Sequence, residues 1–188
     1  GRIINLDTIY LNALSTATEN NLTLISDIVN ADLRGKYQLT QIGQAFTNEI
    51  HKYYAFAPVK KTDPQKMRFN IMIHNSKLLK EFVPSLYTFA PSSLNGILDT
   101  EADSLLVNAS FPHIVYDSFD VKNTTLNISN LNDSSKLAYT LDIKSVESPA
   151  IKLYNSSING AAANNILGVN VFLRDSKNQD KYMIGGNF

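Results

Sequence analysis

Three histidines, His51, His74 and His113, are the residues in this sequence best suited to bind a metal or transfer a proton. Their surroundings place them in a predicted helix, a predicted strand and a predicted turn, and none has a second ligand at the spacing of a zinc site. An isolated histidine more often forms an ordinary surface or core hydrogen bond. The histidines therefore predict neither a metal site nor a catalytic base.

Alternating carboxylates at Asp99, Glu101 and Asp103 begin like a calcium-binding loop. Such a loop needs glycine at its sixth position and glutamate at its twelfth, where this sequence has Ser104 and Ser110. Because the later ligands are missing, we interpret 99–103 as a polar hairpin turn.

Patterns for nucleophilic or nucleotide chemistry are missing as well. No serine stands in a G-x-S-x-G context, no glycine-rich phosphate loop occurs, and paired carboxylates at strand ends are not evident. Cysteine is absent, which excludes disulfides, thiolate catalysis and cysteine-containing metal sites. We therefore expect no catalytic residues, no metal and no cofactor, in a protein that is not an enzyme.

Composition narrows the remaining classes of function. The 188 residues hold 17 Lys plus Arg and 17 Asp plus Glu, so a net charge of zero gives the whole chain no electrostatic reason to bind nucleic acid. No apolar run approaches the roughly 18 residues of a membrane span, and no signal peptide is visible. Because the sequence does not begin with Met, we expect residues 1–188 to be a single segment excised from a longer protein, with Gly1 a cloning remnant.

Apolar and polar residues alternate along most of the chain, which predicts β-strands. Apolar residues occupy every second position in one short segment after another, which is the side-chain period of a β-strand. Each series therefore covers one face of a sheet and leaves the other face to polar residues. The series that define this apolar face are Leu105, Val107, Ala109 and Phe111, then Leu137, Tyr139, Leu141 and Ile143, then Leu167, Val169, Val171 and Leu173.

Turn formers separate these series at 99–103, Pro112, 130–135 and 156–165. Strands follow one another without crossover helices, which predicts an antiparallel meander in a mainly β fold. The first expected segment, 2–13, is one bent strand or two short ones. The other expected strands are 22–25, 29–39, 67–73, 93–98, 104–111, 119–128, 136–144, 150–153, 157–162, 166–174 and 181–185.

After Thr40, the apolar residues recur at helical spacing, and this pattern stops before Pro58. Thr40 is a suitable N-cap. This predicts a helix over about 41–56. It should pack on the sheet, since an amphipathic helix of this length is marginal alone. The side expected to face the sheet carries Ile42, Phe46, Ile50 and Tyr53.

A second, short helix is expected between Ser76, as its cap, and Pro84, which stops it. Both helices then lie in one insertion at about 40–84. The rest of the chain is predicted to be strands and turns.

An apolar sheet face can be closed by a second sheet, as in a sandwich core. The sequence lacks sandwich markers such as a buried Trp or a tyrosine corner. A one-sided meander can instead curl and keep this face as a groove. We favour the groove.

Several runs resemble the repeating sequence of TamB-like proteins of the Bacteroidetes, which belong with the AsmA-like bridge proteins of the bacterial envelope. The runs are 82–86 (FVPSL), 94–98 (LNGIL) and 105–116 (LLVNASFPHIVY). The segments 31–37 (ADLRGKY), 126–141 and 158–173 also resemble the sequences of this family. The resemblance covers nearly the whole chain as a loose pattern.

The resemblance implies an internal segment of a long periplasmic protein of a Gram-negative bacterium. Such proteins are anchored in the inner membrane by an N-terminal helix, which this segment lacks, and bridge the inner and outer membranes. Their curved sheet, a β-taco, is proposed to carry phospholipid acyl chains, or to assist outer-membrane protein assembly with a partner of the Omp85 type. The family brings no catalytic residues. The helix over 41–56 departs from a bare β-groove and is expected to plug or widen it.

The alternative is a periplasmic or surface β-sandwich that binds a protein or glycan partner through its loops. A lipid groove needs an open aliphatic face, whereas a glycan module needs exposed aromatic residues on a flat platform. The nine tyrosines do not cluster in the sequence. This favours the lipid groove, whose predicted lining is the set of twelve apolar positions given above.

Overall fold

The structure, a computed structural model, describes residues 9–188. Positions 2–8 of the first expected strand lie outside the described residues. The elements are β1 (Ile9–Ser15), β2 (Asn20–Ser26), β3 (Val29–Lys36), α1 (Ile42–His51), β4 (Lys66–Ile73), α2 (Lys77–Phe82), β5 (Leu86–Phe89), β6 (Ser92–Asp99), β7 (Ser104–Tyr116), β8 (Phe119–Ser129), β9 (Leu137–Glu147), β10 (Lys152–Ala163), β11 (Ile166–Arg174) and β12 (Asp180–Asn187).

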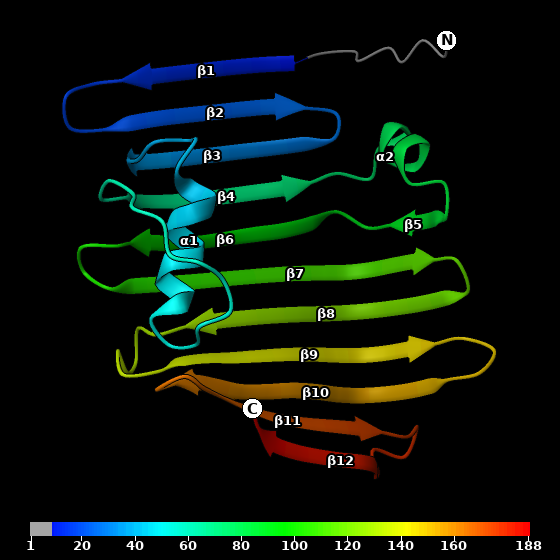
Figure 1. Ribbon diagram of the computed structural model, residues 1–188. Coiled ribbons are helices and arrows are strands. Elements are labelled where there is room, and N and C mark those ends of the chain that lie inside the picture. The colour runs from blue at the N-terminus through cyan, green and yellow to red at the C-terminus, as the bar shows by residue number, and fades with distance from the viewer. Residues whose placement is uncertain (1–8) are drawn as a thin grey trace.

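The strands of the described chain form one open, curved, twelve-stranded antiparallel sheet (Figure 1). Strand order follows the sequence from β1 to β12, except that β5 lies off this path and pairs with β7. Between the two helices, β4 still joins the sheet by pairing with β3 and β6. The predicted curved meander, with one longer and one shorter inserted helix, is confirmed.

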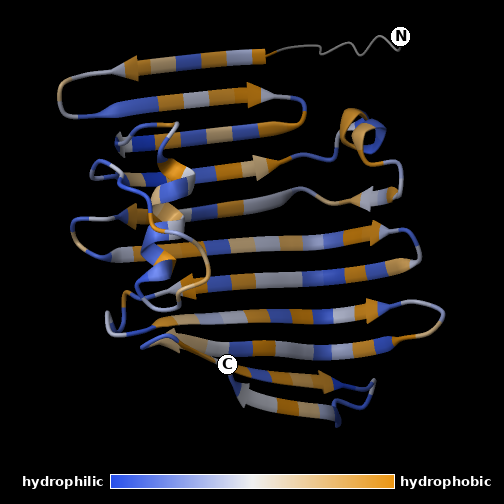
Figure 2. Cartoon of the chain, in the orientation of Figure 1, coloured by the Kyte–Doolittle hydropathy of each residue, from blue (hydrophilic) through white to orange (hydrophobic). Residues whose placement is uncertain are grey.

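The pairing register gives the sheet one apolar face and one polar face. Val107 pairs with Ile128, which pairs with Tyr139, so these side chains point to the same side. One residue further along each strand, Asn108 pairs with Asn127 and forms part of the opposite face. Orange and blue bands alternate along the strands accordingly (Figure 2).

Helix α1 crosses the strands on the apolar face (Figure 1). Ala45 of the helix is 0% exposed, and the ring of Phe46 meets that of Phe69 edge to face. Leu98 and Leu105 of the sheet are fully buried in the same core. The predicted packing side of the helix is confirmed, because its members all contact this core: Ile42, Phe46, Ile50 and Tyr53.

The helix is shorter than predicted, since it ends at His51 rather than near 56. The following backbone bonds to the turn between β10 and β11 instead of continuing the helix. The carbonyl of Tyr53 accepts from the N–H of Asn165, and Asn165 Oδ1 accepts from the N–H of Ala55. A partner distant in sequence therefore decides where the helix stops.

The two predicted caps have different outcomes. Gln41 is the N-cap of α1 and makes no side-chain cap bond, so Thr40 was the wrong residue. Ser76 does cap α2, because its Oγ accepts from the N–H of Leu78 at 3.1 Å.

β7 continues through Pro112, where a turn was predicted. On one side, the neighbour of β7 changes here from β6 to β5, since Ser110 pairs with Ser93 and Ile114 with Phe89. No strand pairs with Pro112 on that side, so its missing N–H interrupts no ladder there.

β10 runs unbroken over Lys152–Ala163, where two shorter strands and a set of turn residues were predicted. Asn155 has a positive φ of 44°, and the register against β11 shifts between Tyr154 and Ser157. A local bulge thus takes up the turn-forming residues without ending the strand. β5, which holds only four residues, was not predicted.

Candidate apolar trough

The structure brings the twelve predicted groove residues together on the apolar face, under and beside α1. Leu105 and Leu137 are buried in the core, and Ala109 is buried as well. The other members keep part of their surface exposed: Val107, Phe111, Tyr139, Leu141, Ile143, Leu167, Val169, Val171 and Leu173.

One row of this face crosses seven strands without a polar residue. Each member is the register partner of the next, from β4 to β11. We call this row the trough floor: Ile71, Leu94, Ala109, Leu126, Leu141, Ile158 and Val171. Only Ala109, Leu141 and Val171 of this row belong to the predicted groove lining, although the other four follow the same period of two.

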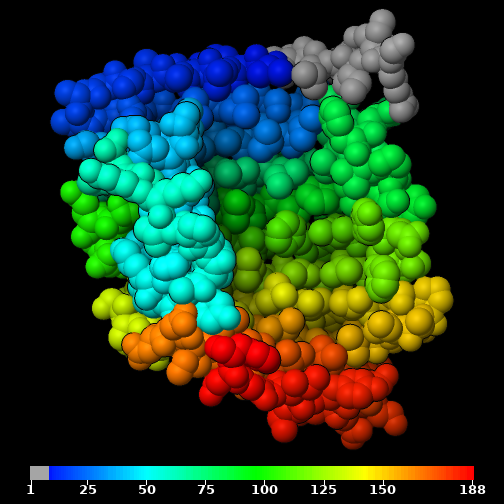
Figure 3. Space-filling view, in the orientation of Figure 1, coloured from blue at the N-terminus to red at the C-terminus, as the bar shows by residue number. Residues whose placement is uncertain are grey.

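The trough has a wall on each side. In the space-filling view, the surface is hollowed between α1 in cyan and the segment of α2 and β5 in green (Figure 3). The middle strands form the bottom of this hollow (Figure 3). The inserted helix therefore narrows the apolar face on one side and leaves the remainder open.

An open cavity of about 350 Å³ lies where α1 meets the trough floor. Ile42 and Phe46 contribute from α1, and Ile71 and Leu94 from the trough floor. All eight lining residues are apolar, the others being Leu33, Met67, Phe69 and Val107. This cavity can accept hydrocarbon without burying an unpaired polar group.

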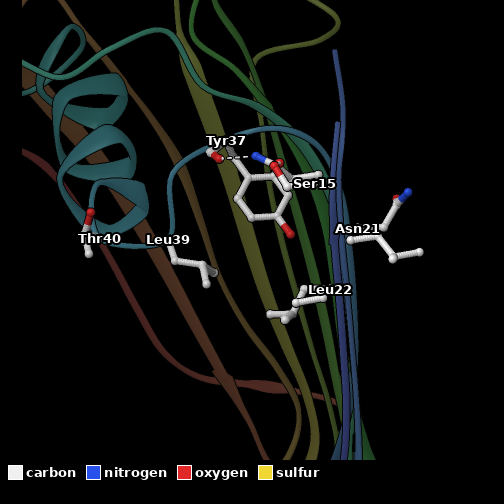
Figure 4. A pocket seen from close by; sticks show the side chains of 9 residues that line it. Ser15, Asn21, Leu22, Tyr37, Leu39 and Thr40 are labelled. Atoms are coloured by element: carbon white, nitrogen blue, oxygen red, sulfur yellow. Dashed lines mark hydrogen bonds between the residues drawn. The ribbon is translucent and has the colours of Figure 1, made fainter. Parts of the chain in front are cut away.

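A smaller cavity of about 270 Å³ lies beside β1 and β2 (Figure 4). Tyr37, Leu39 and Leu22 lie on the same side of the sheet as α1, whereas Asn21 points to the other side (Figure 4). The Tyr37 carbonyl accepts from Asn20 Nδ2 at 2.7 Å, which joins the segment before α1 to β2. The apolar face thus continues beyond the trough floor towards β1.

Two glycines let large rings lie flat on the sheet. Gly96 pairs with Phe69, and a side chain at Gly96 would collide with that ring. Tyr139 likewise reaches over its partner Gly160 and donates to the Gly168 carbonyl at 2.9 Å. Burial raises the pKa of Tyr139. In both pairs the glycine has no side chain, so the aromatic ring of its partner can lie against the backbone beside the trough floor.

A buried amide fixes the end of α1 to the sheet. Asn130 is 3% exposed, and its Oδ1 accepts from the N–H of Leu105 at 2.8 Å. Its Nδ2 donates to the Tyr53 hydroxyl and to the Asp103 carbonyl, both at 2.6 Å. Nothing in the sequence pattern indicated this role, because a loop asparagine has no periodicity.

Helix α1 also carries a buried carboxylate near its C-terminal end. Glu49 is 1% exposed, and its Oε2 accepts from Lys52 Nζ at 2.7 Å, while its Oε1 has no partner in residues 9–188. Burial raises the pKa of Glu49, and Lys52 opposes this shift only in part. Lys52 also pairs with Asp103, which ties the helix to the turn between β6 and β7.

The three histidines lie in different parts of the fold. His51 ends α1, His74 follows β4, and His113 lies inside β7 rather than in the predicted turn. His113 Nε2 lies 2.9 Å from Asp120 Oδ1. No group of three metal-binding side chains gathers within residues 9–188.

The predicted hairpin turn at 99–103 is confirmed, between β6 and β7. Burial would raise the pKa of Asp99, but hydrogen bonds from Lys66 and from the N–H groups of Ala102 and Glu101 hold it below its usual value. Asp99 therefore acts as the capping carboxylate of the turn.

No helix in the described part of the chain is long and apolar enough to cross a membrane. The chain matches no family model, no curated protein and no solved structure. The geometry of the trough is therefore the basis on which a function can be proposed.

Proposed function

We propose that the trough binds the acyl chains of phospholipids, and that the chain is a non-enzymatic segment of a TamB-like or AsmA-like protein in the periplasm. The observation that supports this most is the trough floor, an apolar row over seven strands that α1 flanks and leaves partly exposed. Soluble proteins rarely leave a contiguous apolar surface of this extent open unless it binds something.

The trough floor is long enough to hold a lipid tail. Strands lie about 4.8 Å apart, so six steps between seven strands span roughly 29 Å. The hydrocarbon core of a bilayer is about 30 Å thick, and one lipid tail covers about half of it. A tail lying along the floor crosses the strands and contacts several floor residues, at about 0.8 kcal/mol for each buried methylene.

The closed sandwich is not supported, because the described strands all belong to one sheet and no second sheet lies on the trough floor. The remaining parts of the proposal come from the resemblance of the sequence. They are a bridge between the two membranes, an inner-membrane anchor elsewhere in the full protein, and an outer-membrane assembly partner of the Omp85 type.

Two variants on one strand provide the test. Leu141→Asp places a carboxylate on the trough floor, whereas Thr140→Asp places the same charge on the polar face. Each protein is purified from a Gram-negative host, and co-purified phospholipid is measured by mass spectrometry. Binding of a fluorescent fatty acid is titrated in parallel.

We expect lipid on the wild type and on Thr140→Asp, and its loss from a folded Leu141→Asp. The proposal fails if the wild type carries no lipid and binds no fatty acid. It also fails if Thr140→Asp loses lipid as completely as Leu141→Asp does.

A further inference from the structure

Four basic side chains form a two-by-two array on the polar face, opposite the trough. Arg34 of β3 pairs directly with Arg68 of β4, and Lys36 pairs directly with Lys66. Arg34 and Lys36, like Lys66 and Arg68, are two residues apart on their strands and so share a face. We call these four residues the basic array.

Like charges directly opposite each other destabilise a sheet. Within the described residues, two members of the array have carboxylate partners. Arg34 Nε lies 2.7 Å from Asp32 Oδ1, and Lys66 Nζ lies 2.9 Å from Asp99 Oδ2. Glu19 lies in the same hollow.

The other two cations, Lys36 and Arg68, have no ion pair within residues 9–188. They occupy diagonal corners of the array, where neighbouring residues of a sheet lie about 7–8 Å apart. One anion between them can contact both side chains, because each is long and exposed.

The array borders an open hollow with a volume of about 810 Å³. Thr18 and Ser104 line it, and so do the apolar residues Ile97 and Leu131. Gly35, between the two basic residues of β3, has a φ of 135°, and a side chain there would collide with the Lys66 carbonyl. This glycine lets the two strands bring their cations close together.

We propose that the hollow binds a phosphate group, either of a soluble phosphate compound or of a lipid headgroup. Arg68 offers a planar pair of donors that fits two phosphate oxygens, and Lys36 offers a compact charge on the other side. Arg34, Lys36, Lys66 and Arg68 exceed the nearby Asp32, Asp99 and Glu19 by one positive charge, which suits the single negative charge of a phosphodiester.

The test compares Arg68→Gln and Lys36→Gln with Lys144→Gln. Lys144 is an exposed lysine of β9, away from the hollow. The probes are pyrophosphate in solution, followed by calorimetry and thermal melts, and phosphatidylcholine vesicles with or without phosphatidylglycerol, followed by co-sedimentation. All measurements are made at low and physiological salt, because exposed charges are screened.

We expect the wild type and Lys144→Gln to bind, and each array variant to lose about tenfold in affinity. Without ligand, the array variants should melt at the same or a higher temperature, since each removes one like-charge contact. Binding to pyrophosphate alone assigns a soluble phosphate compound, and binding to anionic vesicles alone assigns a headgroup.

The proposal is overturned if the wild type binds neither probe, or if Lys144→Gln weakens binding as much as Arg68→Gln. Lipid retention in the trough is read from separate variants on the opposite face. Failure at this site therefore leaves the proposed function untouched.

Discussion

The rings of Phe46 in α1 and Phe69 in β4 meet edge to face, with centroids 5.9 Å apart and planes at 76°. This contact joins the helix to the sheet next to the apolar cavity. We expect Phe46→Ala to lower the free energy of unfolding by roughly 2 kcal/mol, less than the 3–5 of a fully buried ring, because Phe46 keeps part of its surface exposed. Denaturant titration measures the change.

Thr47→Ala, one position further along the same helix, is the matched control and should change stability by less than about 0.5 kcal/mol. Equal small effects of both substitutions would show that α1 is peripheral.

The amide of Asn130 should matter more than its loop position suggests. Asn130→Ala removes three hydrogen bonds and leaves the Leu105 N–H buried without a partner, so we expect a loss of about 2–3 kcal/mol. Asn132→Ala, at an exposed position of the same loop, should have almost no effect. Thermal melts of the two variants decide between an anchor and an ordinary loop residue.

A charge should be tolerated on the trough floor and not in the core. Leu141 is partly exposed, so Leu141→Asp can keep its carboxylate hydrated and the protein folded. Leu98 is 0% exposed, so Leu98→Asp buries an unpaired charge and should unfold the protein. Circular dichroism separates the two outcomes, and unfolding of Leu141→Asp would contradict an open trough.

The buried Glu49 predicts a specific pH dependence. Its pKa is raised by burial, with Asp103 and Asp99 adding to the effect and Lys52 opposing it. The folded state therefore binds more protons than the unfolded state above the ordinary pKa of 4.5. The free energy of unfolding should fall as the pH rises from this value through the raised pKa.

Glu49→Gln removes the titrating group and should flatten that part of the stability curve, measured by urea titration between acid and neutral pH. Glu101→Gln, at an exposed position of the nearby turn, is the control that leaves Glu49 in place, so the fall in stability should remain. A wild-type curve that rises over this interval would contradict the prediction.

The edge strand β1 should make the protein associate at high concentration. Its residues are uncharged, and Ile9, Leu11 and Leu14 are each more than half exposed. An uncharged apolar edge is a template for another strand. Sedimentation at increasing concentration should show association that Leu14→Lys reduces and Val59→Lys, in an exposed loop, does not. A monomer that persists at millimolar protein would refute this.

The strands were predictable because alternation over several residues is a local signal with a clear physical cause. The trough face follows from the same signal, as Leu137 to Ile143 show. The end of α1 was not predictable, since Asn165 fixes it from the other part of the chain. Asn130 and the basic array were also missed, because loop contacts and cross-strand pairs depend on register, which the sequence does not state.

The segment after α1 is held by strands that are synthesised late. The C-terminal part is a ladder of hairpins in which each strand pairs with its neighbour in sequence, so these contacts close short loops and form early. The contact between Ala55 and Asn165 instead spans 110 residues. During synthesis α1 and the strand β4 that it packs against leave the ribosome before β10 and β11. The bonds to Asn165 can form only after those later strands have been made, so they are among the last contacts that fix the segment after the helix.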